Sequence, residues 1–199
     1  MLSRMVEIST ASRSHYLLCS DMTCDRKVVI FCSSSQSGID PKYDSAAKEL
    51  VRALVERGYT VVSGGTRKGT MGVVSDEVVA AGGKHIGVIP RFMESVVARE
   101  LTGTVWVDTM SERKDKMREG TCAAVALPGG VGTLEELVET LTLAKLHRYD
   151  GKIFALNIDG FYDRLIGLLE HYVDTKMMDA ATMELISFPK TVDEIVKML

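Results

Sequence analysis

The chain contains a series of short apolar segments in which polar and apolar residues do not alternate. These segments lie at residues 28–32, 60–63, 86–89, 123–127 and 153–156. A strand without alternation is buried on both faces, which is typical of a parallel sheet that helices cover on either side. The pattern therefore predicts an α/β protein.

Segments with helical spacing separate these predicted strands. They lie at about residues 41–57, 73–82, 111–120, 137–146, 161–175 and 192–199. A short apolar segment at 186–188 adds a last strand, whereas the stretch that contains Val105, Trp106 and Val107 shows no regular pattern. Strands that alternate with helices predict a doubly wound, Rossmann-like parallel sheet in three α/β/α layers.

The length and composition are those of one domain. The 199 residues, 46% of them hydrophobic, are enough for a single core. We expect this domain at residues 27–199, and a peripheral N-terminal extension at residues 1–26, whose apolar cluster at 16–19 is too short for a signal peptide. No apolar run approaches the roughly 20 residues that cross a bilayer, so we expect a cytoplasmic protein without a membrane partner.

Charge and cysteine usage exclude other classes of protein. The formal net charge is −3, and the basic residues are scattered among acidic ones, so we expect no nucleic-acid partner. The cysteines are Cys19, Cys24, Cys32 and Cys122, with no CxxC pair. We expect free thiols in a reducing compartment, with Cys32 and Cys122 in the core, and no metal site.

Residues 128–136 read PGGVGTLEE and join a predicted strand to a predicted helix. Glycines in such a turn remove Cβ atoms and allow positive φ, so that backbone N–H groups converge on an anion at the positive end of the helix. The turn therefore predicts a phosphate site. Glu135 and Glu136 lie in the first helical turn, where a carboxylate would repel a phosphate that it touched. We expect at least one of them to face another part of the ligand.

Two more loops leave the carboxyl ends of predicted strands, at residues 33–38 and 63–66. Open parallel sheets bind ligands beyond these ends, where the strand order reverses, so we expect the three loops to converge. A single glycine-rich turn is equally explained by tight packing. Neither GxGxxG nor a P-loop is present, so no dinucleotide cofactor or nucleoside triphosphate is indicated.

The charged helix offers a further candidate. Arg113 has the planar fork that suits a phosphate oxygen or a ribose hydroxyl, and Lys114 does not. The alternative is a solvated helix face, which the residues alone favour slightly. That face would contain Glu112, Arg113, Asp115, Lys116 and Arg118. His85 and His147 lie near the ends of elements and need not be ligands.

The chain resembles the lonely guy family of cytokinin-activating phosphoribohydrolases, long described as possible lysine decarboxylases. The resemblance rests on Pro-Gly-Gly-x-Gly-Thr-x-x-Glu at 128–136, preceded by Met-x-x-Arg-Lys at 110–114. Further blocks in family order lie at residues 31–35, 63–65, 69–72, 86–90, 100–103 and 156–162. Decarboxylation by pyridoxal phosphate would need a Schiff-base lysine in a matching context, which the chain does not offer, and we expect no cofactor.

The resemblance implies hydrolysis of the N-glycosidic bond of a purine nucleoside 5′-monophosphate, either AMP or an N6-modified, cytokinin-type adenosine monophosphate. Free base and ribose 5-phosphate are released. Arg113 and Glu136 match the catalytic pair. The implied substrate-binding residues are Glu100, Lys114, Gly129, Gly130, Val131, Gly132, Thr133, Leu134 and Glu135, with Ser34, Gly65 and Met71 from neighbouring blocks. A homodimer or larger homo-oligomer, with the active site near the subunit interface, is also implied.

The chemistry of these residues agrees with the implied reaction. A carboxylate such as Glu136 stabilises an oxocarbenium-like sugar, either as a nucleophile or as a base for water. Arg113 would orient Glu136, bind phosphate or assist departure of the base. Glu135 suits ribose hydroxyls, or is simply favoured by the helix dipole. The segment between Gly103 and Met110 is shorter than in plant-like members, which affects recognition of the base.

The alternative function is a non-catalytic carrier of a nucleotide or of molybdenum cofactor. Such a protein would use the same fold and the same phosphate loop. It would not need Arg113 and Glu136 together, and the presence of both residues favours the enzyme.

Overall fold

Seven strands in the described part of the chain, residues 26–33 and 38–199, form one sheet in this computed structural model. The strands are β1 (Lys27–Phe31), β2 (Thr60–Ser63), β3 (His85–Pro90), β4 (Gly103–Val107), β5 (Thr121–Ala126), β6 (Lys152–Ala155) and β7 (Ile186–Ser187). Every neighbouring pair is parallel, as the absence of alternation predicts. The predicted Ser34 contact and nearly all of the predicted N-terminal extension lie outside the described residues.

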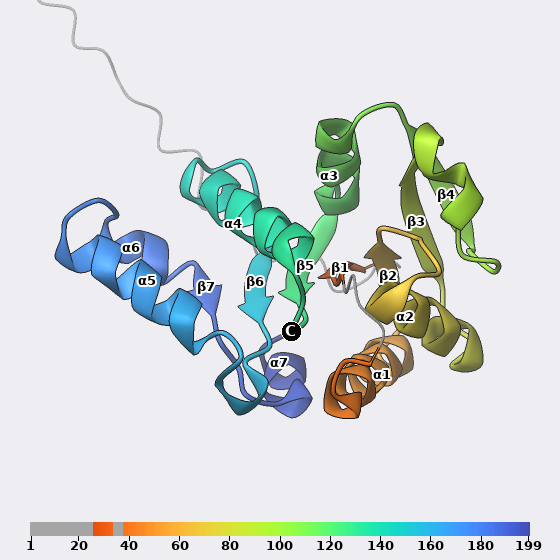
Figure 1. Ribbon diagram of the computed structural model, residues 1–199, viewed down its shortest axis with the longest axis horizontal. Coiled ribbons are helices and arrows are strands. Elements are labelled where there is room, and N and C mark those ends of the chain that lie inside the picture. The colour runs from red at the N-terminus through yellow and green to blue at the C-terminus, as the bar shows by residue number, and fades with distance from the viewer. Residues whose placement is uncertain (1–25, 34–37) are drawn as a thin grey trace, which may run out of the picture.

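Helices cover both faces of the sheet (Figure 1). They are α1 (Pro41–Glu56), α2 (Gly69–Ala80), α3 (Met110–Arg118), α4 (Val131–Lys145), α5 (Asp163–Asp174), α6 (Ala180–Met183) and α7 (Val192–Met198), with 3₁₀ turns η1 (Arg91–Val96) and η2 (Ile158–Gly160). One core lies beneath α1, α2 and α7, and a second beneath α3, α4 and α5. The fold is therefore the predicted three-layer α/β/α domain.

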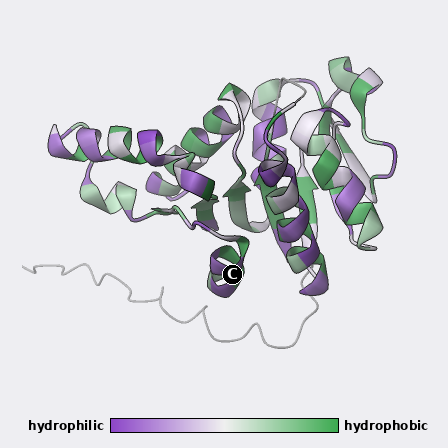
Figure 2. Cartoon of the chain, turned by 60° about the horizontal axis from the view of Figure 1, so that its bottom comes forward, coloured by the Kyte–Doolittle hydropathy of each residue, from purple (hydrophilic) through white to green (hydrophobic). Residues whose placement is uncertain are grey.

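The central strand shows why the apolar segments do not alternate. Val28 and Ile30 belong to one core, and Val29 and Phe31 to the other, and none of the four is more than 1% exposed. The strands at the centre of Figure 2 are largely hydrophobic, whereas the helices around them carry both hydrophilic and hydrophobic residues. Both faces of β1 are thus removed from water, which is the main source of stability in such a sheet.

The strand order is β4-β3-β2-β1-β5-β6-β7. The chain moves outward from β1 through β2 and β3 to β4, then returns to place β5 on the other side of β1. The order therefore reverses between β1 and β5, which is where a doubly wound sheet opens a crevice beyond its carboxyl ends. The loops that follow Phe31 and Ala126 border this position.

One stretch predicted to be irregular is a strand. β4 pairs with β3 alone at the edge of the sheet, and its side chains are alternately half-buried and exposed until Val107. Trp106 is 38% exposed there. An edge strand does not need apolar residues on both faces, so a search for continuous apolar runs overlooks it. The short helix α6 was also not predicted.

Cys122, which was predicted to lie in the core, is exposed, and so is Leu146 at the end of the helical segment predicted at 137–146. Leu146 follows the last residue of α4 and is 59% exposed, so the apolar face of that helix ends at Ala144. Cys122 is exposed because the register between β1 and β5 shifts there: Lys27 pairs with Thr121, whereas Val28 pairs with Ala123. Such a shift turns a side chain away from the regular pleat.

Candidate functional site

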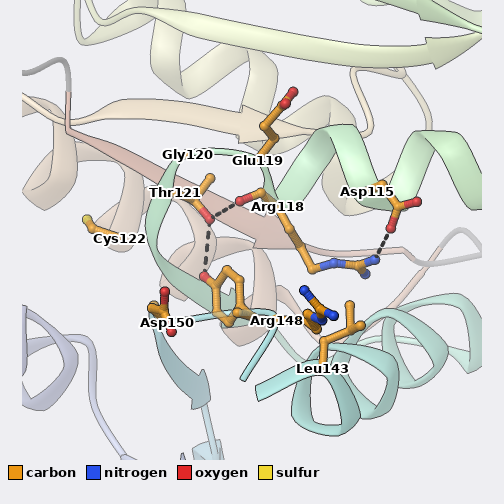
Figure 3. Close-up of a pocket in the computed structure, with 11 residues that line it drawn as sticks. Asp115, Arg118, Glu119, Gly120, Thr121, Cys122, Leu143, Arg148 and Asp150 are labelled. Carbon is orange, nitrogen blue, oxygen red and sulfur yellow. Dashed lines mark hydrogen bonds and ion pairs between the residues drawn. The ribbon is translucent and has the colours of Figure 1, made fainter. Parts of the chain in front are cut away.

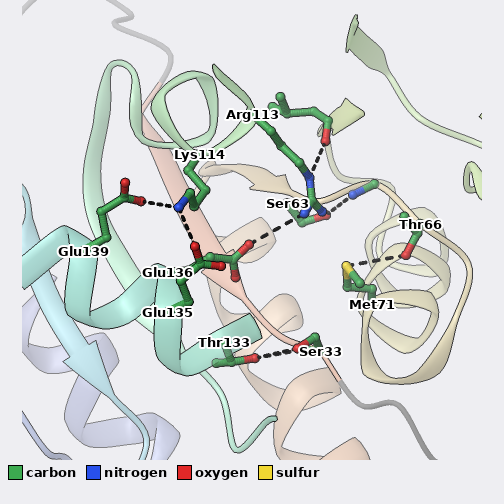
Figure 4. A network of polar contacts seen from close by, with 12 residues as sticks. Ser33, Ser63, Thr66, Met71, Arg113, Lys114, Thr133, Glu135, Glu136 and Glu139 are labelled. Carbon is green, nitrogen blue, oxygen red and sulfur yellow. Dashed lines mark hydrogen bonds and ion pairs between the residues drawn. The ribbon is translucent and has the colours of Figure 1, made fainter. Parts of the chain in front are cut away.

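The loops after β1 and β5 are joined directly at the point where the strand order reverses. The Gly130 N–H donates to the Ser33 carbonyl at 2.8 Å, and the Ser33 N–H donates to Thr133 Oγ1 at 2.8 Å. The two hydroxyl oxygens lie 3.2 Å apart (Figure 4). These contacts confirm that the two loops converge.

The N-terminus of α4 opens at this junction. Gly130 is the N-cap residue, and no side chain caps the helix. The first N–H groups of a helix have no partner within it, and they lie at the positive end of the helix dipole. The side chains of Val131 and Leu134 are 83% and 40% exposed, so the backbone of this turn is the part available to an anion. Thr133 is fully buried, and its hydroxyl also closes the loop.

The glycines of this loop serve close packing. Gly130 has a φ of −83°, and Gly129 and Gly132 are likewise not in the positive-φ region, contrary to our expectation that the loop uses positive φ. A Cβ atom on Gly129 would lie 2.3 Å from Thr133 Oγ1. The physical requirement here is space, because the loop folds back onto its own threonine.

Arg113 reaches the site from α3. Its Nε donates to the Val88 carbonyl at 3.1 Å, and the residue is only 6% exposed. The guanidinium lies against the loop after β2, since a Cβ atom on Gly64 would be 1.8 Å from Nη2. Burial lowers the pKa of Arg113, and the neighbouring Glu136 opposes this.

The solvated face that the sequence favoured for α3 is therefore wrong for two of its five residues, because Arg113 and Arg118 are buried, whereas Glu112, Asp115 and Lys116 are exposed. Lys114, which was not assigned to that face, is also buried. Charge pattern cannot identify the inward face of a short helix, because long basic side chains can bury their stems.

Glu136 faces Arg113 across the site. Its Oε1 lies 3.9 Å from Arg113 Nη1, and the residue is 8% exposed. Burial raises the pKa of Glu136 to about 7, although the charge of Arg113 lowers it. This carboxyl group is therefore poised to change protonation state near neutral pH, as many catalytic carboxyl groups are.

Glu135 faces a different partner. Its side chain is 58% exposed, and Oε1 lies 2.7 Å from Lys114 Nζ. The hydrogen bond to Glu135 raises the pKa of Lys114. Figure 4 shows the two adjacent carboxylates with separate cations, Glu135 with Lys114 and Glu136 with Arg113.

The remaining predicted residues divide between two places. Gly65 follows β2 with its N–H donating to Ser63 Oγ at 3.1 Å, and Met71 Sδ lies 2.9 Å from where a Cβ atom on Gly64 would stand. Both therefore lie beside Gly64, the residue against which the Arg113 guanidinium packs. Glu100 is exposed and instead lines a separate hollow of about 440 Å³ with Arg67.

Another hollow, of about 600 Å³, lies near the amino ends of β5 and β6 and contains none of the predicted site residues (Figure 3). Sequence reasoning did not single out Glu139, which binds Lys114, or Arg118, which lines this hollow. The i, i+4 spacing of Glu135 and Glu139 is the sequence signal that relates them. Across residues 26–33 and 38–199, no group of His, Cys, Asp and Glu side chains forms a metal cluster, and no helix is long and apolar enough to span a membrane.

A parallel sheet with an uncapped helix N-terminus at its switch point defines a Rossmann-like α/β protein. Comparisons specify the family. A family model described as "Possible lysine decarboxylase" matches residues 71–199. The cytokinin riboside 5′-monophosphate phosphoribohydrolase LOG3 of Arabidopsis thaliana is 41% identical over 180 residues, which cover 87% of this chain and 81% of LOG3. The enzyme LOG of Oryza sativa subsp. japonica is 40% identical over 177 residues, which cover 86% of this chain and 71% of LOG. The chain belongs to this lonely guy (LOG) family.

Solved structures show the same fold at lower identity. The molybdenum cofactor binding protein of Rippkaea orientalis has a TM-score of 0.69 and 17% identity, covering 89% of this chain and 96% of that one. The molybdenum cofactor carrier protein of Chlamydomonas reinhardtii has a TM-score of 0.66 and 19% identity. The match covers 87% of this chain and 95% of the carrier protein. At these identities the likeness concerns the fold alone.

Proposed function

We propose that this protein is a phosphoribohydrolase that cleaves the N-glycosidic bond of a purine nucleoside 5′-monophosphate, of the cytokinin riboside type or AMP. The observation that carries the proposal is the buried Arg113–Glu136 pair beside an uncapped, glycine-rich helix end. It occurs in a chain 41% identical to a cytokinin riboside 5′-monophosphate phosphoribohydrolase.

The 5′-phosphate is held at the N-terminus of α4. The backbone N–H groups of Val131, Gly132 and Thr133 lie in the first turn of this helix, where they can donate to phosphate oxygens. Glu135 and Glu136 follow in the second turn, not in the first turn as the sequence had suggested. Binding the phosphate there places the ribose near these carboxylates. The reacting groups are thus held in the right orientation before the bond breaks.

Glu136 acts in its ionised form on the anomeric carbon. The bond from C1′ to the base nitrogen breaks, the base leaves with the bonding electrons and takes up a proton, and water supplies the hydroxyl that remains on C1′. Glu136 stabilises the positive charge on the sugar, as a nucleophile or as the base that deprotonates this water. Arg113 positions Glu136 and favours its charged form.

Lys114 and Glu135 act on the sugar. Lys114 Nζ holds one oxygen of Glu135 at 2.7 Å, and the side chain of Glu135 is 58% exposed. A carboxylate held in this way accepts hydrogen bonds from ribose hydroxyls. Glu100, in its separate hollow, is proposed as a further substrate contact on the strength of the family motif alone.

We further propose that residues 27–199 form the catalytic unit, that it acts in the cytoplasm, and that it assembles as a homodimer or larger homo-oligomer. One side of α4 supports the assembly, because Val131, Leu134 and Val138 are 83%, 40% and 42% exposed. This apolar stripe begins at the phosphate loop. A second copy that covered it would remove apolar surface from water close to the site.

The test is to incubate the purified protein with AMP and, separately, with isopentenyladenosine monophosphate. Free base and ribose 5-phosphate are followed by chromatography, with Glu136→Gln as the matched control. Release of base by the wild-type protein alone would support the proposal and rank the substrates. Nucleotide binding without release would favour a carrier.

A further inference from the structure

We propose that Arg118 and Glu139 are positioning residues for the reaction: Arg118 fixes Glu139, and Glu139 in turn holds Lys114 against Glu135. The inference rests on the proposed function. It concerns two residues that do not reach the substrate but determine where a substrate-binding cation lies.

The contacts form one continuous chain of charges. Arg118 Nη1 lies 2.8 Å from Glu139 Oε2, and the same oxygen lies 3.3 Å from Lys114 Nζ. Lys114 Nζ then lies 2.7 Å from Glu135 Oε1. At its other end, Arg118 Nη2 is 2.8 Å from Asp115 Oδ1, the contact drawn in Figure 3. Glu139 is therefore shared by two cations and connects Arg118 to the site.

Helical spacing produces this arrangement. Lys114 and Arg118 are four residues apart on α3, and Glu135 and Glu139 are four residues apart on α4. Residues with this spacing lie one above the other on the same face of a helix. Two cations on one helix therefore face two carboxylates on the other. The pairing holds the two helices in one register beside the phosphate loop.

Burial makes the pairing specific. The side chains of Arg118 and Lys114 are only 5% and 10% exposed, so most of each side chain is packed against the protein. A buried cation without a partner is costly, and Glu139 is the partner common to both. Loss of its charge would leave Lys114 with Glu135 alone, and the ammonium would be free to move toward solvent with that exposed side chain.

The same charges act on Glu136. It is surrounded by Arg113, Lys114 and Arg118 from α3, by Glu135 on its own helix, and by Cys32 at the end of β1. After burial and Arg113, the pKa of Glu136 is raised by Glu135 and lowered by Lys114 and Arg118. Lys114 and Arg118 therefore favour the ionised form of Glu136, and both cations are paired with Glu139.

The test compares Arg118→Met and Glu139→Gln in pH profiles of kcat/KM for the nucleotide. Loss of the Arg118 cation should move the acid limb to higher pH, because Arg118 favours the ionised form of Glu136. Glu139→Gln should lower kcat about tenfold with a smaller change in KM, since it disturbs positioning. Glu139→Asp, which keeps the charge, should restore kcat. A purely structural role would leave the acid limb of Arg118→Met at its wild-type position and would give no rescue by Glu139→Asp.

The control is Lys116→Met. Lys116 pairs with Glu119 at 2.9 Å on the exposed side of α3, so its loss removes a charge from the same helix away from the site. Variants that match this control in kcat and pH profile, beside an active wild-type protein, would overturn the inference and leave the proposed function intact. An inactive wild-type protein would overturn the proposed function and this inference with it. If Arg118→Met does not fold, the partly exposed Glu139 still decides the outcome through its Gln and Asp variants.

Discussion

Arg113 Nη1 lies 3.9 Å from Glu136 Oε1, and both side chains are almost entirely shielded from water. The distance is longer than that of a close hydrogen-bonded ion pair, and burial outweighs the attraction, so the pKa of Glu136 is raised to about 7. The pair therefore combines a fixed cation with a carboxyl group that is ionised only in part at neutral pH. The following predictions depend on this relationship and on its surroundings.

Glu136→Gln should abolish most turnover and retain nucleotide binding. The amide keeps the shape of the side chain and removes the charge that stabilises the sugar cation, so kcat should fall by about a thousandfold or more, with a modest change in Kd. Base release and calorimetric binding measure the two quantities. Glu135→Gln is the neighbouring control and should mainly weaken binding. A Glu136→Gln protein with retained turnover would contradict the assignment.

The pH dependence of activity should follow Glu136. Since the carboxylate is the active form, kcat/KM should rise with pH and level off above an apparent pKa of about 7. Below that pKa it should fall roughly tenfold per pH unit. The phosphate of the substrate titrates nearby, so the Kd of the nucleotide for Glu136→Gln over the same pH range separates the two ionisations. A wild-type kcat/KM that stays flat between pH 5 and pH 8, once the effect of the substrate phosphate is separated in this way, is incompatible with the proposal.

The free energy of unfolding should depend on pH through the ionisation of Glu136. The pKa of Glu136 is raised from 4.5 to about 7 on folding, so its contribution to stability is full below pH 4.5 and is lost as pH rises through 7. A shift of this size corresponds to about 3 kcal/mol. Urea unfolding at several pH values should show this loss in the wild-type protein and its absence in Glu136→Gln. Parallel curves for the two proteins would show that Glu136 is not perturbed.

Gly64→Ala should damage activity more than stability. Its Cβ atom would meet Arg113 Nη2 at 1.8 Å and Met71 Sδ at 2.9 Å, so the guanidinium must move away from its place beside Glu136. We expect kcat/KM to fall by about a hundredfold. The matched control is Gly167→Ala in α5, where a Cβ atom meets nothing within 4 Å. This substitution should stabilise the helix by about 0.5–1 kcal/mol. Equal activity of the two variants would place Arg113 outside the reaction.

Val138→Glu should reduce self-association. Val138 is 42% exposed on the apolar side of α4, and a carboxylate there could not be buried against a second copy without a partner. Light scattering after size-exclusion chromatography should show a smaller species than the wild-type protein forms. Lys116→Met serves as a surface control. A wild-type protein that is monomeric at micromolar concentration would contradict the proposed assembly.

Local sequence patterns determined the layered fold and the position of the phosphate loop. Residues 28–32 are apolar without interruption because one set packs into each core, and this signal is present in five consecutive residues. The PGG turn is similarly local, since a strand, its glycines and the following helix are adjacent in the chain. Such features depend on periods of two or 3.6 residues, which a sequence displays directly.

Only the tertiary structure decided which charged groups meet. Ser33 binds Thr133 across 100 residues of sequence, and Arg113 meets Glu136 because α3 and α4 pack beside the switch point. Nothing in the charge pattern of α3 distinguishes Arg118, which is 5% exposed, from the exposed Lys116. Which side of a helix is buried depends on its rotation against its neighbours. That rotation is set by contacts between distant segments, and the same contacts set the local dielectric that raises the pKa of Glu136.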